Sequence, residues 1–179
     1  MNDDLAVIQR VITGDVESFR VLVQRYQHLL FATVRNLVPD AGECEDVAQE
    51  VFLAAFTHLG SYDPRRAAFS TWLLTIARNK CWNMLSKKRP QLRGRLPEGA
   101  DRRTPDREAA EAECFRRLDE ALAALPFEQK TAFVLAEIQG LSLEEVAKVE
   151  GVKVGTVKSR LSRAREKLRA WFRPAVEQP

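Results

Sequence analysis

Apolar residues recur every three or four positions along almost the whole chain, which is the spacing of one face of an α-helix. Four such segments fill the first half. Gly14 ends the first, Pro39 ends the second, and the turn-like stretch 60–66 separates the third from the fourth. The pattern therefore predicts helices up to Gly14, from Asp15 to Pro39, and over residues 44–59 and 68–87.

The composition changes after residue 88. Residues 89–103 contain prolines, glycines and arginines but few large apolar residues, which predicts a flexible basic linker. Helical spacing returns at Thr104-Pro105-Asp106, a favourable helix start, and continues to Pro126. A further helix is predicted over 127–138, before Gly140. We expect an all-α fold of two small helical domains, 1–88 and 104–179, joined by the linker 89–103.

Residues 141–168 have the pattern of a helix-turn-helix. Ser142 followed by Glu145 is a capping box, which predicts that a short helix begins at the next residue, Leu143. Glu150-Gly151 predicts a tight turn, after which a second short helix is expected to start near Val154. The predicted inward residues are small or aliphatic: Val146, Ala147, Val149, Val157, Leu161, Ala164 and Leu168.

The second helix of this motif is strongly basic. Residues 153–173 contain eight lysines and arginines and a single acid, Glu166, whereas the whole chain has a net charge of +3. Repulsion between these cations opposes folding until DNA phosphates neutralise them. An isolated charge run is usually a solvated surface, but the capping box, the small Ala147 and the turn at Gly151 together favour DNA binding.

The composition argues against several other classes of protein. The three cysteines lie far apart without a C-x-x-C pair, which favours a reducing, cytoplasmic location. The acidic start is unlike a signal peptide, and no apolar run is long enough to span a membrane. His28 and His58 lack neighbouring metal ligands, and no glycine-rich phosphate loop occurs. We therefore expect no enzyme, metal, cofactor, small-molecule substrate or membrane insertion.

The predicted third helix has an acidic face. Asp46, Gln49 and Glu50 fall on one side of it, beside Phe52, which we expect to be buried. This face suits a basic partner surface, but an ordinary solvated exterior explains the same residues. The pattern by itself leaves both interpretations open.

Several motifs occur together, in order, over nearly the whole chain. They are Gly14-Asp15 with Ser18-Phe19 and Arg25-Tyr26-Gln27; Asp46–Phe52; Phe69–Leu73 with Ile76–Asn79; Ala124-Leu125-Pro126; and Gly155–Arg160 with Arg163-Ala164-Arg165. In this combination the chain resembles the extracytoplasmic-function (ECF) sigma factors, which belong to the sigma-70 family of bacterial RNA polymerase. A helix-turn-helix alone would be less specific, because other transcription regulators share it.

The resemblance implies a sigma factor that binds core RNA polymerase, directs it to specific promoters and helps to open the DNA for transcription initiation. Its region 2 is then expected to bind the clamp of the largest catalytic subunit, through Asp46, Gln49, Glu50 and Phe52. Its region 4 is expected to bind the −35 element, and an anti-sigma factor is an expected partner. The expected −35 contacts are Thr156, Lys158, Ser159, Arg160, Ser162 and Arg163. The alternative is a one-component regulator with a sensing domain and a helix-turn-helix.

Region 2 is also expected to recognise and melt the −10 element. Stacking of a base on an aromatic ring contributes about 1–3 kcal/mol, and Tyr62 is the candidate platform, with a role as a loop anchor as the alternative. Trp72 lies on the apolar stripe of its helix, which favours core packing over base contact. The other expected contacts to the −10 strand are Arg65, Arg66, Arg78, Asn79 and Lys80.

Overall fold

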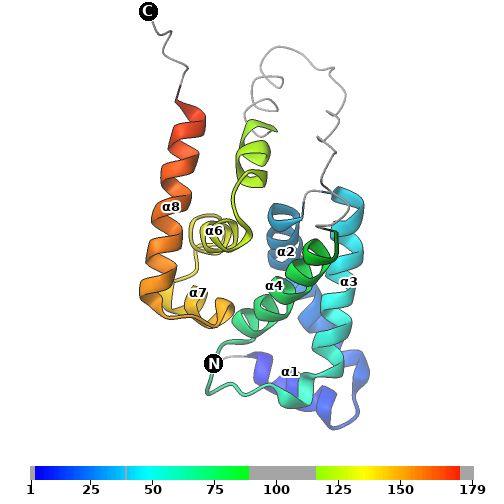
Figure 1. Cartoon of the computed structure of the whole chain (residues 1–179). Helices are drawn as coiled ribbons and strands as arrows, with labels where there is room; N and C mark the ends of the chain where they lie inside the picture. The colour runs from blue at the N-terminus through cyan, green and yellow to red at the C-terminus, as the bar shows by residue number, and fades with distance from the viewer. Residues whose placement is uncertain (1–2, 39, 89–115, 174–179) are drawn as a thin grey trace, which may run out of the picture.

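The computed structural model describes residues 3–38, 40–88 and 116–173. The N-terminal half contains α1 (Asp3–Ile12), η1 (Val16–Ser18), α2 (Phe19–Leu37), α3 (Ala41–Thr57), η2 (Leu59–Ser61) and α4 (Phe69–Lys88). The C-terminal half contains helical residues 116–123, α6 (Phe127–Phe133), the π-helical turn η3 (Val134–Ile138), α7 (Leu143–Glu150) and α8 (Val154–Phe172). The described residues include no strand, which confirms the prediction of an all-α fold (Figure 1).

Local capping sets several of the helix boundaries. α3 begins earlier than predicted because the Asp40 carboxylate accepts a hydrogen bond from the backbone N–H of Gly42 at 2.9 Å. Asp15 caps η1 by accepting a hydrogen bond from the backbone N–H of Ser18, and its carboxylate accepts a second one, 2.6 Å long, from the Ser18 hydroxyl. Gly14 has a φ of 110°, so the turn between α1 and η1 requires a residue without a side chain.

The helix boundaries predicted for the C-terminal half are less accurate. The helix start at Thr104-Pro105-Asp106 and the linker 89–103 lie outside the described residues, and the described part of that helix is 116–123. The segment 127–138, predicted as one α-helix, changes to π-helical geometry at Val134. The last helix, α8, has 19 residues and is longer than the short helix expected from the motif.

Helices α2, α3 and α4 pack on one another in the N-terminal half, with α1 against α2. Their apolar stripes form one core, which α1 completes from one side (Figure 1). Phe69 at the start of α4 is fully buried in this core and contacts the rings of Tyr26 and Trp72. Other fully buried side chains of the core are Leu22, Leu30, Val34, Val51 and Leu73.

The two halves pack directly against each other, which the sequence pattern did not predict. Leu74 of α4 is 1% exposed and belongs to an apolar cluster whose other buried members all come from the C-terminal half. In return, Phe127 of α6 and Val134 of η3 join the core of the N-terminal half. α4 therefore lies beside α7, and the two halves form one continuous structure across the described residues (Figure 1).

Candidate nucleic-acid interface

The helix-turn-helix forms as the sequence predicts. Glu145 accepts a hydrogen bond from the backbone N–H of Ser142 at 2.9 Å, and Ser142 Oγ accepts one from the backbone N–H of Glu145 at 3.2 Å. This capping box starts α7 at Leu143 and holds the pKa of the Glu145 carboxyl below its usual value. Gly151 adopts the left-handed conformation, with a φ of 66°, and ends the helix.

Helix α8 presents a buried face and a cationic exposed face. Val157, Leu161, Ala164 and Leu168 are buried, as predicted, because they recur at helical spacing. Most of the predicted −35 residues lie on the remaining surface of the helix. Lys158, Ser159, Ser162 and Arg163 are exposed and Thr156 is half-buried.

Arg160 differs from the other predicted −35 residues because its guanidinium is already bound within the protein. Its Nη1 lies 2.5 Å from Oε2 of Glu150, the last residue of α7, whose side chain is fully buried. Burial raises the pKa of the Glu150 carboxyl, and the hydrogen bond from Arg160 opposes that rise. In this structure Arg160 therefore joins the two helices of the motif.

Tyr62 is both an aromatic surface and a loop anchor. Its hydroxyl donates a hydrogen bond to the backbone carbonyl of Ala67 at 3.1 Å, which closes the loop between η2 and α4. Its ring lies edge-on to Phe69, with centroids 5.6 Å apart, and 5.4 Å from the ring of Trp72. The anchor role is present in the structure, and stacking of a base on the same ring stays a prediction.

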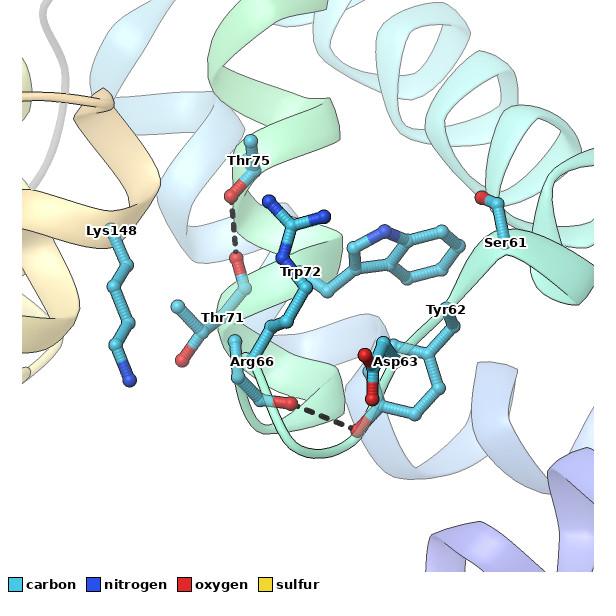
Figure 2. Close-up of a pocket in the computed structure, with 9 residues that line it drawn as sticks. Ser61, Tyr62, Asp63, Arg66, Thr71, Trp72, Thr75 and Lys148 are labelled. Atoms are coloured by element: carbon cyan, nitrogen blue, oxygen red, sulfur yellow. Dashed lines mark hydrogen bonds between the residues drawn. The ribbon is translucent and has the colours of Figure 1, made fainter.

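A pocket of about 450 Å³ opens beside this loop (Figure 2). Tyr62, Arg66 and Trp72 line it from the N-terminal half, together with threonine hydroxyls from α4. Lys148 of α7 lines it from the C-terminal half. Trp72 is half-buried, so the expected core role is accompanied by an exposed edge at the pocket.

The two arginines of the loop are held differently. Arg65 makes two hydrogen bonds of 3.0 Å to the Asp63 carboxylate, which hold the pKa of that carboxyl below its usual value. The Arg65 side chain nevertheless remains 89% exposed. Arg66 is exposed and lines the pocket, so its guanidinium is available to a ligand there.

On α4, the three predicted strand-binding residues have different surroundings. Arg78 lies over the rings of Trp82 and Phe127, 6.0 and 5.7 Å from their centroids, and donates to the Asn79 side chain at 3.1 Å. Asn79 is exposed. Lys80 forms a 2.9 Å ion pair with Glu50 of α3, so a predicted DNA contact is bound to a predicted polymerase contact.

The loop rests on a polar contact from α1. Asp4 is 2% exposed, and its carboxylate accepts a 2.6 Å hydrogen bond from the Tyr26 hydroxyl. The same carboxylate forms an ion pair with Arg25. The Tyr26 ring packs on Phe69, whose centroid is 5.2 Å away, and Phe69 in turn supports Tyr62. α1 therefore helps to fix the aromatic cluster below the pocket.

The acidic face of α3 is exposed as predicted. Asp46, Gln49 and Glu50 all point to solvent, on the side of α3 away from the core. Phe52 was expected to be buried and is only half-buried, because it packs on the edge of the core. Its remaining exposed surface adds an apolar element beside the acidic residues.

Sequence reasoning missed two residues that the structure places at the site. The sequence pattern places Lys148 on a short amphipathic helix and Glu150 in a turn, and it assigns a functional role to neither. The one local signal was the position of an acid at the end of a helix, where the helix dipole does not favour it. That position indicates a tertiary partner, which for Glu150 is Arg160.

Cys44 and Cys81 are buried, and burial raises the pKa of both thiols. Both thiols therefore ionise poorly, and the two side chains contribute to the core. Cys114 lies outside the described residues. Within the described residues, no three metal-type ligands gather into a group. In the same part of the chain, no helix combines the length and apolarity needed to cross a bilayer.

A helix-turn-helix with a cationic exposed helix, packed beside a helical unit with an aromatic pocket, defines a DNA-binding protein. Comparison with known proteins specifies the class. The profile of Sigma-70 region 2 matches residues 22–91, and that of Sigma-70 region 4 matches residues 115–168. Both matches follow the order and approximate positions of the two halves described above.

Whole-chain relatives agree with this assignment. The chain is 34% identical to the RNA polymerase sigma-H factor of Pseudomonas aeruginosa, over 98% of this chain and 96% of the relative. It is 35% identical to the ECF RNA polymerase sigma-E factor of Escherichia coli K12, over 97% and 96%. It is 32% identical to the ECF sigma factor SigW of Bacillus subtilis, over 93% and 95%.

Two solved structures share the fold. CnrH in complex with the cytosolic domain of CnrY matches with a TM-score of 0.73 and 29% identity, over 94% of this chain and 96% of that one. The sigma factor RpoE of Bartonella quintana, in complex with the anti-sigma factor NepR, matches with a TM-score of 0.71 and 25% identity, over 90% and 99%. The chain belongs to the ECF sigma factors of the sigma-70 family.

It is accordingly a transcription initiation factor that directs RNA polymerase to promoters. The N-terminal half is region 2 and the C-terminal half is region 4. This assignment accounts for both halves, whereas a one-component regulator would need a sensing domain in place of region 2.

Proposed function

We propose that the two halves divide the promoter between them, region 4 gripping duplex −35 DNA and region 2 holding the unpaired −10 strand. The observation that carries this proposal is the difference between their surfaces. Region 4 offers an exposed cationic helix, which suits the major groove of a duplex. Region 2 offers an aromatic-lined pocket beside arginines, which suits an extruded base.

For the −35 element, the proposed reading face of α8 consists of residues in its first three turns. Lys158, Ser159, Ser162 and Arg163 are exposed there, and Thr156 lies at the helix start. Arginine can bind both O6 and N7 of a guanine, while hydroxyls bind bases or phosphates. Arg160 is proposed to join this face when its guanidinium leaves the Glu150 carboxylate and binds DNA.

For the −10 element, opening a base step costs a few kcal/mol of stacking and pairing. Binding of the extruded base offsets this cost, because stacking on an aromatic ring contributes about 1–3 kcal/mol. Tyr62 and Trp72 form the aromatic wall of the pocket, and Arg66 stands at its rim. Arg65, Arg78, Asn79 and Lys80 are proposed to bind the backbone and base edges of the same strand.

For the polymerase, the proposed contact is the exposed face of α3 with Asp46, Gln49, Glu50 and the exposed part of Phe52. Two acids, an amide and an apolar edge suit a basic partner surface, which the clamp is proposed to supply. Among the described residues, Glu50 forms its ion pair with Lys80. An exposed pair of this kind is worth only about 0–1 kcal/mol, so a partner cation can replace it.

We also propose that the protein acts in the cytoplasm as a binding factor without catalysis, cofactor or metal. The polymerase supplies the chemistry, and this chain supplies recognition. An anti-sigma factor is a proposed partner, because the similar Bartonella quintana factor was solved with one.

The test is transcription with the reconstituted holoenzyme. Promoter DNA is selected by the holoenzyme from a random pool, and run-off transcription and permanganate footprinting then follow start-site choice and melting. We expect transcription and permanganate-reactive thymines near the start site only when the factor is present. A purified chain that neither joins core polymerase nor directs initiation would contradict the proposal.

A further inference from the structure

The turn of the helix-turn-helix contains a fully buried carboxylate. Glu150 is the last residue of α7, and none of its side chain is exposed to solvent. The dipole of a helix disfavours an acid at this end, and burial of an unpaired charge adds a second cost. The carboxylate therefore depends on its ion pair with a residue of α8.

The residue of α8 is Arg160, which lies on the proposed reading face. Four residues spaced i, i+3, i+4 and i+7 share one side of this helix: Thr156, Ser159, Arg160 and Arg163. Ser159 and Arg163 are exposed, but only 23% of the Arg160 side chain is. Its Nη1 lies 2.5 Å from Oε2 of Glu150. Arg160 therefore has the position of a DNA contact, while its charge is bound at the joint between α7 and α8.

The two oxygens of the Glu150 carboxylate have different surroundings. Oε2 accepts the hydrogen bond from Arg160, whereas Oε1 is buried without a hydrogen-bond partner in the described residues. Burial raises the pKa of this carboxyl, and Arg160 opposes the rise. Of the other charges around it, Arg78 of α4 lowers the pKa and Glu128 of α6 raises it. Departure of Arg160 therefore favours the neutral acid, and Oε1 can accept a proton without losing a hydrogen bond.

We propose that Glu150 controls the access of Arg160 to the −35 element: the guanidinium passes from the buried carboxylate to the DNA, and the carboxylate takes up one proton from solvent. The proton replaces the charge that Arg160 supplied, so the buried side chain is neutral while DNA is bound. Phosphates near α8 disfavour a negative charge on Glu150 in the same direction. Glu150 is thus a positioning residue that acts on DNA through Arg160. The inference rests on the proposed function, because it takes α8 as the helix that binds the −35 element.

This exchange makes the affinity for −35 DNA depend on pH. Because a proton is taken up on binding, affinity falls as pH rises, by at most about tenfold per pH unit for one proton. At acidic pH Glu150 is already neutral in the DNA-free protein, so binding takes up no further proton there. The contribution of Glu150 to the pH dependence should therefore vanish at the acidic end and grow towards neutral pH.

The test compares wild type with Glu150→Gln in the reconstituted holoenzyme. The amide keeps the shape of the side chain and removes both its charge and its titration. Fluorescence anisotropy with a labelled duplex of the selected promoter, at a temperature too low for opening, measures affinity over a series of pH values. We expect Glu150→Gln to bind about tenfold more tightly near neutral pH, with the ratio of the two affinities falling towards one as pH falls. A ratio that is the same at every pH would overturn the proposal.

Glu144→Gln is the matched control for the loss of one negative charge. Glu144 is exposed on the same helix, and its substitution makes the same change in net charge. This variant should follow the pH profile of the wild type and should gain much less affinity than Glu150→Gln. An equal gain in both variants would show that acids of α7 simply repel DNA, and would overturn the role of the ion pair.

The Arg160→Gln background shows whether Glu150 acts through Arg160. This background has no guanidinium to exchange, so adding Glu150→Gln should change neither the affinity nor its pH profile. A gain as large as in the wild-type background would overturn the proposal. Circular dichroism checks that each variant folds, because Arg160→Gln leaves the Glu150 carboxylate without its partner. If Arg160→Gln does not fold, the pH comparison of Glu150→Gln with wild type decides.

Arg163→Ala separates failure of this inference from failure of the proposed function. Arg163 is exposed on the same side of α8, so its loss tests whether that side binds the −35 element at all. If Arg163→Ala weakens binding while Glu150→Gln matches wild type at every pH, only the exchange is overturned. If Arg163→Ala and Arg160→Gln both leave the affinity unchanged, the proposed role of α8 fails and the inference fails with it.

Discussion

The two proposed DNA surfaces differ in how the protein holds most of their cations; Arg160 of α8 and Arg66 of region 2 are the exceptions. On α8, Lys158 and Arg163 extend into solvent, and the described residues include no ion pair for either. On region 2, Arg65 is bound to Asp63, Lys80 to Glu50, and Arg78 lies over two aromatic rings. A duplex presents regularly spaced phosphates, which mobile surface cations can bind. A melted strand is flexible, so the protein must hold its binding groups in fixed positions.

This difference predicts that the DNA surface of region 2 depends on the packing beneath it far more than the DNA surface of α8 does. Phe69→Ala removes the fully buried ring that supports Tyr26, Tyr62 and Trp72. We expect the free energy of unfolding to fall by about 3–5 kcal/mol, as for other buried aromatic truncations. Urea denaturation measures it. Phe31→Ala is the control at a 39% exposed position of α2 and should cost much less, and similar losses would refute the role of Phe69.

The second prediction separates the two roles of Tyr62. Tyr62→Ala should weaken open-complex formation by about 1–3 kcal/mol, because the stacking surface is lost. Tyr62→Phe removes only the hydrogen bond to Ala67 and should retain most of the melting. Permanganate footprinting of the holoenzyme compares them, with −35 duplex binding as the control. Equal defects in both variants would mean that Tyr62 acts through the loop and not as a platform.

The third prediction tests whether α8 reads bases. Arg163→Ala should cost about 1–3 kcal/mol of binding at a cognate −35 site if the guanidinium binds a base edge. Fluorescence anisotropy with cognate and scrambled duplexes measures the loss. A base contact affects the cognate site more strongly, whereas an equal loss on both duplexes would show that Arg163 contacts phosphate alone.

The smallest expected effect concerns the cap that positions α7. Ser142→Ala removes the hydrogen bonds to Glu145 and should destabilise the protein by about 1 kcal/mol. Those bonds lower the pKa of Glu145 from its ordinary value of 4.5. A lowered folded-state pKa gives stability that is present above the unfolded value and is lost as pH falls through the folded one.

The difference between wild type and Ser142→Ala should therefore be full near neutral pH and should shrink as pH falls below about 4.5. Thermal unfolding at a series of pH values measures it. A difference that stays constant down to strongly acidic pH would show that the Glu145 charge contributes nothing to the cap.

The features that the sequence predicted well are encoded by neighbouring residues. The capping box joins Ser142 to a residue three positions later, and the buried face of α8 repeats within a single helix. Helix spacing and turn residues are therefore sufficient to place them. The same reasoning found the exposed face of α3 and the loop around Tyr62, although it expected Phe52 to be more deeply buried.

The features that it missed join residues distant in the chain. Leu74 reads as one more apolar residue of α4, and nothing nearby shows that it is enclosed by region 4. Lys130 reads as a surface cation, yet its partner is the carbonyl of Leu37. Glu150 reads as part of a turn, while its side chain is buried and paired with half-buried Arg160 of the next helix. Burial of such groups depends on the docking of two units, which periodicity within either unit does not specify.

The ion pair between Lys80 and Glu50 has a consequence for the timing of initiation. When a cation of the clamp binds Glu50, as proposed, the ammonium of Lys80 loses the acid with which it pairs in the described residues and becomes available to the strand. By reciprocity, a strand that captures Lys80 strengthens the hold of Glu50 on the enzyme. The coupling free energy is only about 0–1 kcal/mol. It therefore makes melting slightly more favourable on the polymerase than off it.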